Sequence, residues 1–278
     1  MSEQLQTAAR YILNQPRDVA LLSMREQARQ AGVQPATMTR LAKYLGMAGY
    51  EDIRQQYADA MRSDTTGFAG RVGVQAKSQE LIGDRALAAD ILAGITAQMG
   101  QLSQPESLGV LVEAAKLISG ARRIYCLGLR SSHSPAWHLH YILSLAGKHS
   151  TMLEAVGGIG ADALGSATAE DVLVAVSVLP YTRQTIEIAD YAGEAGVQLV
   201  AITDSPVSPL AQLSVCTLVV PTESPSFLHT MSPAFVIAEV LGALVAGRAG
   251  DAASATLAGV DRQSAALNIH VKTRMKRS

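Results

Sequence analysis

The sequence has only two cysteines in 278 residues, Cys126 and Cys216, and each lies within an apolar run. Two thiols in such runs are typical of buried, inert side chains rather than of a disulfide, which fits a reducing compartment. The N-terminal decapeptide MSEQLQTAAR is polar and lacks the apolar centre of a signal peptide. We therefore expect a cytoplasmic protein.

Long apolar runs and charge are also scarce. No apolar stretch reaches the roughly 20 residues that a membrane-spanning helix needs. Residues 231–249 come closest, but Glu239 and several small residues there favour a buried core helix, so we expect no membrane partner. Charged residues make up 17% of the chain and the net charge is −1, so any attraction to nucleic acid must be local. Hydrophobic residues, at 48%, suffice for a substantial core.

Two kinds of pattern meet near residues 63–85. The preceding residues are helical with short breaks. The stretch itself is rich in Gly, Ser and Thr without a sustained period, and it predicts a linker or loosely ordered connector. A helix from about 87 to 119 follows, and then strand and helix signals alternate. We assign residues 1–80 to a helical domain with its linker and residues 81–278 to an α/β domain.

The helical domain contains a short helix, a glycine turn and a second helix. Ser23-Met24-Arg25-Glu26 is a capping box that starts the first helix, Gly32 ends it, and Gln34-Pro35 opens the second. In a helix-turn-helix, the second helix of such a pair lies in the major groove of DNA. The side chains expected to face DNA, because they fall outside the apolar stripe or at helix starts, are Ser23, Gln34, Pro35, Ala36, Thr37, Thr39, Arg40 and Lys43.

Charge supports this interpretation modestly. Residues 1–62 hold eight Arg or Lys and six Asp or Glu, which gives 8 − 6 = +2. A plain helical bundle with a solvated polar face is the alternative.

The α/β domain is predicted from five short apolar runs with helical patterns between most of them. The runs are 123–127, 150–153, 171–177, 198–203 and 216–220, and the helical patterns are 135–146, 182–195 and 232–249. Such alternation predicts a mainly parallel sheet covered on both faces. Ligands of these sheets lie at the carboxyl ends of the strands, which places residues 128–133, 177–185 and 203–208 around one crevice.

The helical domain resembles the N-terminal domain of RpiR/MurR-type transcriptional regulators. The shared features are Tyr11-Ile12-Leu13, Ser23, the Ala28/Gly32-Val33 turn, Ala36-Thr37, Arg40-Leu41, and Leu45-Gly46 followed by Gly49-Tyr50. The family usually has serine where this chain has Gln34, and glutamine caps a helix poorly. Residues from about 121 to 249 resemble the sugar isomerase (SIS) domain to which the family couples this domain. The resemblance implies an α-β-α sandwich with a five-stranded parallel sheet behind an all-α helix-turn-helix domain.

The resemblance also implies that phosphosugars bind at two turns, Gly-x-Gly-x-Ser and Ser-x-Ser-Gly-x-Thr. Arg130 replaces the second glycine of the first turn, and Leu179 and Pro180 replace a serine and the glycine of the second. At least two donors to a phosphate are thereby lost, and Arg130 and Arg183 would offset them with charge. A solvent-facing Arg130 beside a vestigial pocket is the alternative. The expected effector-binding residues are Gly128, Arg130, Ser131, Ser132, Ser177, Tyr181, Thr182, Arg183 and Thr185.

Other candidates are weaker. Asp204 is expected to shape a turn. Residues that precede the last helix are either ligand contacts or caps, namely Thr222, Ser224, Ser226 and His229. His133, His138 and His140 lack partners at ligand spacing, so we expect no metal and no cofactor. The basic tail, residues 270–278, is expected to be solvated.

We therefore expect a ligand-responsive regulator rather than an enzyme. It would bind double-stranded operator DNA as a homodimer or homotetramer, sense a small anionic metabolite, and transmit the signal through the helix at 87–119. The alternative is an aldose–ketose isomerase, for which Glu154, Glu223 and His229 are the candidate proton carriers. A nicotinamide enzyme is excluded because GLRSSH is not a Gly-x-Gly-x-x-Gly turn.

Overall fold

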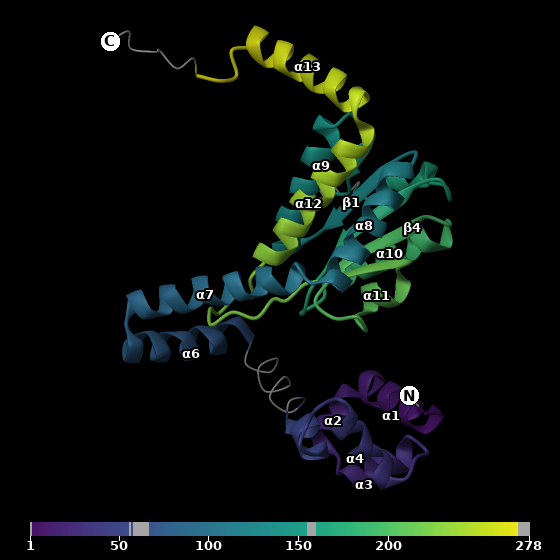
Figure 1. The fold of residues 1–278 in the computed structure, drawn as a ribbon, viewed down its shortest axis with the longest axis vertical. Coiled ribbons are helices and arrows are strands. Elements are labelled where there is room, and N and C mark those ends of the chain that lie inside the picture. The colour runs from purple at the N-terminus through teal and green to yellow at the C-terminus, as the bar shows by residue number, and fades with distance from the viewer. Residues whose placement is uncertain (1, 56, 58–66, 155–159, 272–278) are drawn as a thin grey trace. The chain divides into compact units, whose positions relative to one another are not determined.

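The computed structural model describes residues 2–55, 57, 67–154 and 160–271 (Figure 1). The chain divides into two compact units. The first is Met1–Ala88 together with Pro225–Leu228, and the second is Ala89–Ser224 together with His229–Ser278. A short segment far along the chain, Pro225–Leu228, therefore packs with the N-terminal unit.

The N-terminal unit begins with a bundle of short helices around a small apolar core. Its helices are α1 (Glu3–Asn14), α2 (Pro16–Leu21), α3 (Met24–Gln30) and α4 (Pro35–Tyr44), followed by helical residues 50–55. Ser23 Oγ accepts a hydrogen bond from Glu26 N at 3.3 Å, as the capping box predicts for the start of α3. Gly32, with φ +68°, makes the turn into α4. Ala28, Met38 and Leu41 meet in the core between α3 and α4.

A buried glutamine ties this bundle together. Gln27 of α3 is fully buried, and its Nε2 donates to Val19 O at 3.0 Å and to Leu22 O at 2.8 Å. Its Oε1 accepts from the hydroxyl of Tyr50. Three polar groups near the end of α2 and in the last helical stretch are thus satisfied by one side chain, which fixes α3 between them.

The predicted connector is wrong for most of its length, because α6 (Gly67–Ile82) is a regular helix. Residues 63–66 lie outside the described part of the chain. Gly83, with φ +82°, separates α6 from α7 (Asp84–Leu102). The single helix expected at 87–119 is wrong too: it is divided into α7 and α8 (Pro105–Gly120), with proline in the first turn of α8.

The second unit contains the predicted five-stranded sheet, and all of its pairings are parallel. Its strands are β1 (Ile124–Gly128), β2 (Ser150–Met152), β3 (Val172–Val176), β4 (Gln198–Thr203) and β5 (Cys216–Val219). Their spatial order is β2-β1-β3-β4-β5. Gly128 is in register with Val176, and Val176 with Ile202, so β1, β3 and β4 end at the same edge of the sheet.

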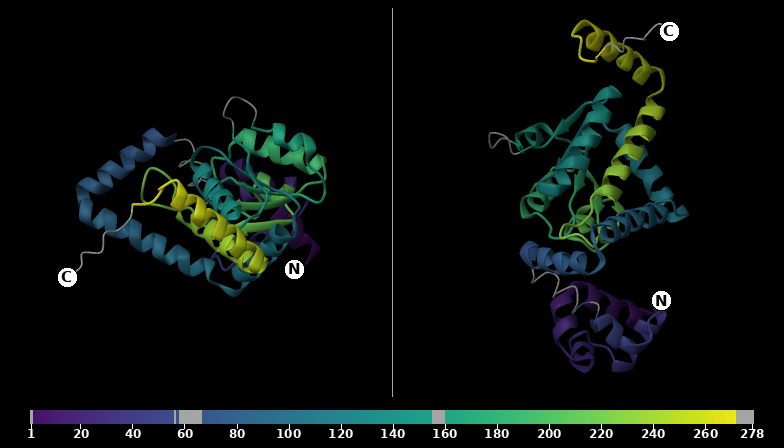
Figure 2. Two further views of the ribbon diagram at one scale, coloured as in Figure 1. Left: turned by 90° about the horizontal axis from the view of Figure 1, so that it is seen from above. Right: turned by 90° about the vertical axis from the view of Figure 1, so that its left-hand side faces the viewer.

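Helices cover both faces of the sheet, as Figures 1 and 2 show. One face packs against α8, α9 (His133–Leu145) and α12 (Ser232–Ala249), and the other packs against α10 (Arg183–Glu194) and α11 (Pro209–Leu213). Side chains alternate between the two cores: Ile124 and Cys126 enter the first, and Tyr125 and Leu127 the second. The predicted α-β-α sandwich is confirmed.

Within the described residues, α12 is the one helix long and apolar enough to cross a membrane by length and composition. It packs on α8 and α9, and its buried residues include Ile237, Leu241 and Val245. Its buried side is thus part of the core of this unit, while the rest of the helix, of which 39% is buried in all, is half-buried or exposed.

The two thiols differ in burial. Cys126 is fully buried, and burial raises the pKa of its thiol to about 12, although a hydrogen bond to Ser150 opposes the shift. Cys216 is only half-buried, because β5 is an edge strand, so the expectation of two buried thiols holds for one. Both are free.

A further helix, α13 (Asp251–Ala266), follows Gly250, where the sequence analysis assigned no element. Of its residues, Ala253 is the buried one. The apolar periodicity that would have indicated a helix is therefore weak. Residues 272–278 of the basic tail lie outside the described part.

Candidate functional site

Helix α4 presents a small cationic surface. Ala36, Arg40 and Lys43 are exposed, and Pro35 and Thr39 are partly exposed. Ser23 and Gln34 are exposed at the starts of α3 and α4, and the Gln34 side chain makes no capping bond, as expected for glutamine. The cations on this face are available to an anionic partner such as DNA.

Thr37 departs from the prediction, because it is fully buried. It lies four residues before Leu41 and therefore on the same, core-facing side of α4. Its Oγ1 accepts from Arg40 Nη2 at 3.2 Å and lies 3.4 Å from Gln4 Oε1. Thr37 thus accepts a hydrogen bond from Arg40 and does not itself face DNA.

The first predicted effector turn follows β1 directly. Gly128 is tightly enclosed: a Cβ at this position would lie 2.3 Å from Ser132 O and 2.8 Å from Ala136 Cβ. Residues Arg130–Ser132 form a short 3-10 turn that leads into α9. Only glycine at 128 allows this turn to fold back onto the strand.

Arg130 occupies the left-handed region, with φ +58°. A Cβ is disfavoured there, which gives a physical reason for the glycine that the SIS pattern has at this position. The side chain is exposed and makes no hydrogen bond or ion pair with the described residues. A strained backbone thus holds, at the carboxyl edge of the sheet, a guanidinium that pairs with none of the described residues.

Two polar pairs flank Arg130. Ser131 Oγ lies 2.9 Å from His229 Nε2, which comes from the segment before α12. His133 Nε2 lies 3.3 Å from Glu154 Oε1, just after β2. Ser132 is buried beneath the turn. Sequence reasoning named these residues but gave no sign of either pairing.

The second predicted turn is held by the loop after β4. Ser177 is buried, and its N donates to Ile202 O at 3.1 Å. Leu179 N donates to Asp204 Oδ2 at 3.1 Å. Burial, and after it the Asp204 carboxylate, raises the pKa of the Tyr181 hydroxyl. Asp204 therefore stabilises the turn by accepting this hydrogen bond, as expected, and it adds a negative charge to the region.

The residues that open α10 divide into two groups. Thr182 precedes the helix without a side-chain capping bond, and Thr185 is fully buried with no hydrogen-bond partner for Oγ1 among the described residues. Arg183 points along its own helix: its side chain is 90% exposed, and Nε lies 2.7 Å from Glu187 Oε1. Arg130 is thus the better placed of the two predicted cations to hold an anion.

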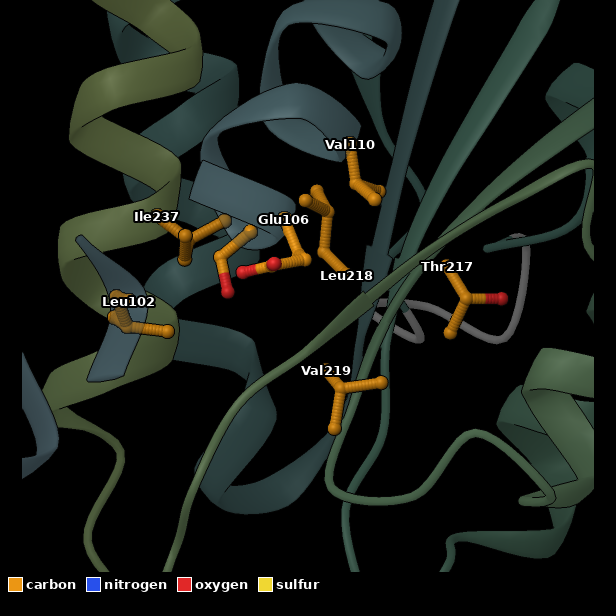
Figure 3. Close-up of a pocket in the computed structure, with 8 residues that line it drawn as sticks. Leu102, Glu106, Val110, Thr217, Leu218, Val219 and Ile237 are labelled. Carbon is orange, nitrogen blue, oxygen red and sulfur yellow. The ribbon is translucent and has the colours of Figure 1, made fainter. Parts of the chain in front are cut away.

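Cavities in this unit lie mainly beside the edge strand β5. One of about 180 Å³ is lined by residues of α7, α8, β5 and α12, most of them apolar, among them Leu102, Val110 and Ile237 (Figure 3). Another, of about 350 Å³, is lined by both Asp204 and Glu223. Neither is lined by the predicted effector residues, of which Gly128, Ser132, Ser177 and Thr185 are buried.

Metal binding has no support in the described residues, where no three His, Cys, Asp or Glu side chains gather to hold an ion. His138 stacks on Phe235 and lies 3.4 Å from Glu239, while His140 Nδ1 lies 2.9 Å from Ser150 Oγ. Each of these two histidines is therefore engaged between structural elements.

Comparison with known proteins agrees with both halves of this fold. The family described as "Helix-turn-helix domain, rpiR family" matches residues 1–64, and the SIS domain matches residues 117–244. The N-terminal bundle is thus an rpiR-family helix-turn-helix domain, and the sheet with its helices is an SIS domain.

Similar proteins include both regulators and a bifunctional protein. The bifunctional protein glk of Paraburkholderia xenovorans is 30% identical over 210 residues, which cover 74% of this chain but 31% of that protein. The chain thus spans less than a third of the length of the first curated relatives that it matches. The regulator HexR of Pseudomonas aeruginosa is 26% identical over 86% of this chain and 81% of its own length.

A solved structure extends the likeness of fold to almost the whole chain. NanR of Vibrio vulnificus, complexed with ManNAc-6P, is 22% identical with a TM-score of 0.56 and covers 96% of this chain and 94% of its own. At this identity the likeness concerns the fold alone.

Proposed function

We propose that this chain is a cytoplasmic DNA-binding regulator whose SIS domain senses a small anionic metabolite, a phosphosugar or a related compound. The observation that carries the proposal is the pairing of two sites in one chain. One is an exposed cationic face on α4 of a helix-turn-helix, and the other is an exposed arginine, in a strained backbone conformation, at the carboxyl edge of an SIS sheet.

Operator binding rests on Arg40 and Lys43. Both are exposed on the second helix of the motif, where side chains reach base edges and phosphates. Proteins with this motif bind as dimers to half-sites about one helical turn apart, so a homodimer or homotetramer is part of the proposal.

Effector binding rests on Arg130, supported by the hydroxyl of Ser131 and by Thr182. A guanidinium offers a planar fork to a phosphate or carboxylate, which compensates for the donors that Leu179 and Pro180 remove. The phosphosugar bound to NanR, a protein of similar fold, is the first class to test.

A regulator fits this crevice better than an isomerase. The three candidate proton carriers are separately engaged: Glu154 with His133, His229 with Ser131, and Glu223 in the cavity that Asp204 also lines. Isomerisation requires an acid and a base converging on one substrate.

The test is binding of the full chain to a duplex from its own upstream region, followed by fluorescence anisotropy. Affinity should fall steeply as salt rises, because counterions are released from the phosphates. Arg40→Ala should weaken binding by about ten-fold or more, since one arginine contact to a base is worth roughly 1–3 kcal/mol.

Arg29→Ala is the matched control, because Arg29 is an exposed arginine on α3 that already pairs with Glu26. It should change the affinity much less. Equal affinities of the wild type and Arg40→Ala would show that Arg40 of α4 does not contact DNA. Absence of binding to any operator-like duplex would contradict the proposed function.

A further inference from the structure

The segment between β5 and α12 touches two distant parts of the chain within three residues. His229 Nε2 lies 2.9 Å from Ser131 Oγ, in the first effector turn. Phe227 N donates to Gln75 Oε1 of α6 at 2.8 Å. Phe227 belongs to the compact unit that contains the helix-turn-helix, whereas His229 belongs to the unit that contains the sheet.

Two further bonds make this segment a closed loop. Thr230 N donates to Thr222 O at 3.0 Å, which joins the two ends of the loop. Gln98 Nε2, from α7, donates to Glu223 O at 2.8 Å just inside that junction. Phe227 and His229 are only two residues apart, a reach of at most about 7 Å along the main chain, so the positions of their two contacts are linked through a short covalent path.

We propose that this loop, residues 222–230, transmits the state of the effector turn to α6, and that the Ser131–His229 hydrogen bond is where the transmission begins. The inference rests on the proposed function and specifies how the site is regulated. An anion held by Arg130 would take the adjacent Ser131 hydroxyl as a donor, in competition with His229. Ligand then favours one loop position over the other, as any switch requires.

The loop replaces the transmitter that the sequence suggested. The helix expected at 87–119 is interrupted before Pro105, so α7 and α8 do not form one rigid rod. The loop joins the effector turn to α6, the first described helix that follows the helix-turn-helix.

Amide hydrogen exchange of the full chain tests the proposal without a ligand. Ser131→Ala and His229→Ala each remove the same hydrogen bond. Each should raise exchange at the amides of residues 226–228 by about five-fold, the effect of losing one ordinary hydrogen bond. The double variant should show no more than His229→Ala alone, because the Ser131 hydroxyl has no role here beyond the bond that His229→Ala already removes.

Three further arms make the result decisive. Gln75→Ala removes the acceptor of Phe227 N and should raise exchange there directly. By reciprocity it should also raise exchange at the Ser132 amide, which donates to Leu129 O at 3.2 Å in the effector turn. Ser134→Ala is the control, because Ser134 Oγ bonds Ser131 O at 3.2 Å without involving His229, and it should leave residues 226–228 unchanged.

The proposal is wrong if Ser131→Ala, which alters only one hydroxyl, leaves exchange at 226–228 at the wild-type rate while Gln75→Ala raises it. This outcome is separate from failure of the proposed function, because exchange is measured without DNA. If the protein binds no operator yet shows the coupled changes in exchange, the proposed regulatory function is wrong but the coupling through residues 222–230 stands.

Discussion

Replacing Arg130 with glycine should separate the stability of the SIS unit from its affinity for anions. The residue has φ +58°, where a Cβ costs about 1–2 kcal/mol. Glycine removes that cost but adds freedom to the unfolded chain, which costs about 0.4–1 kcal/mol. The guanidinium makes no bond with the described residues that would be lost. Arg130→Gly should therefore stabilise the unit by about 0.5–1 kcal/mol.

Arg130→Ala provides the matched comparison. Alanine keeps the Cβ and its strain, so its stability should stay close to that of the wild type. Both variants lose the charged donor, and a hydrogen bond to a charged group is worth about 1.5–3 kcal/mol, so anion affinity should fall by roughly ten-fold or more. The glycine variant should therefore be more stable but bind less well.

Two assays measure these effects. Urea unfolding followed by circular dichroism gives the free energies of unfolding. In a thermal melt, a change of 1 kcal/mol in a unit of this size corresponds to about 2–4 °C in Tm. A thermal-shift panel of phosphosugars and organic acids gives the binding. If Arg130→Gly destabilises by more than about 1 kcal/mol, the side chain holds the fold. If a ligand stabilises wild type and both variants equally, Arg130 does not bind the anion.

Two other predictions concern buried polar groups. Burial raises the pKa of the Asp171 carboxyl, but hydrogen bonds from Arg122 and from two backbone amides outweigh it and leave the pKa lowered. Its contribution is therefore present above the unfolded pKa of about 3.9 and lost as pH falls through the folded value. Asp171→Asn should lower the free energy of unfolding by about 2 kcal/mol at pH 7. In urea unfolding at a series of pH values, the variant should lose less stability than the wild type as the pH falls to 3. An equal loss in both proteins would contradict this role. Gln27→Leu should cost about 3 kcal/mol in the helix-turn-helix, because two backbone carbonyls and the Tyr50 hydroxyl lose their partner, and a loss below about 1 kcal/mol by thermal unfolding would argue against that role.

The sheet was predictable because its central strands β1, β3 and β4 are short buried apolar runs separated by helical patterns, whereas β2 is only Ser-Thr-Met. The strand at 198–203 and the helix at 232–249 lie where the sequence placed them. Helix α6 was missed because glycines open it and its apolar residues show no single face. The break before Pro105 was missed although Gln34-Pro35, the same kind of signal, had been used to start α4.

The site was only partly predictable. The turns at 128–133 and 177–185 follow from the topology of a parallel sheet, since β1 and β3 end at one edge. The contact between Ser131 and His229 joins residues 98 apart, and no local pattern encodes it. Thr37 was misplaced because a polar side chain was taken as evidence of exposure, whereas its spacing from Leu41 determines the face it occupies.

The enclosure of Gly128 limits how this edge of the sheet can evolve. Exposed side chains of this edge, such as those of Arg130 and Leu179, can be replaced without displacing a neighbouring element. A methyl group at 128 would instead push away the carbonyl of Ser132 and the start of α9 together. The exposed positions can therefore change their chemistry while the path of the main chain beneath them stays fixed.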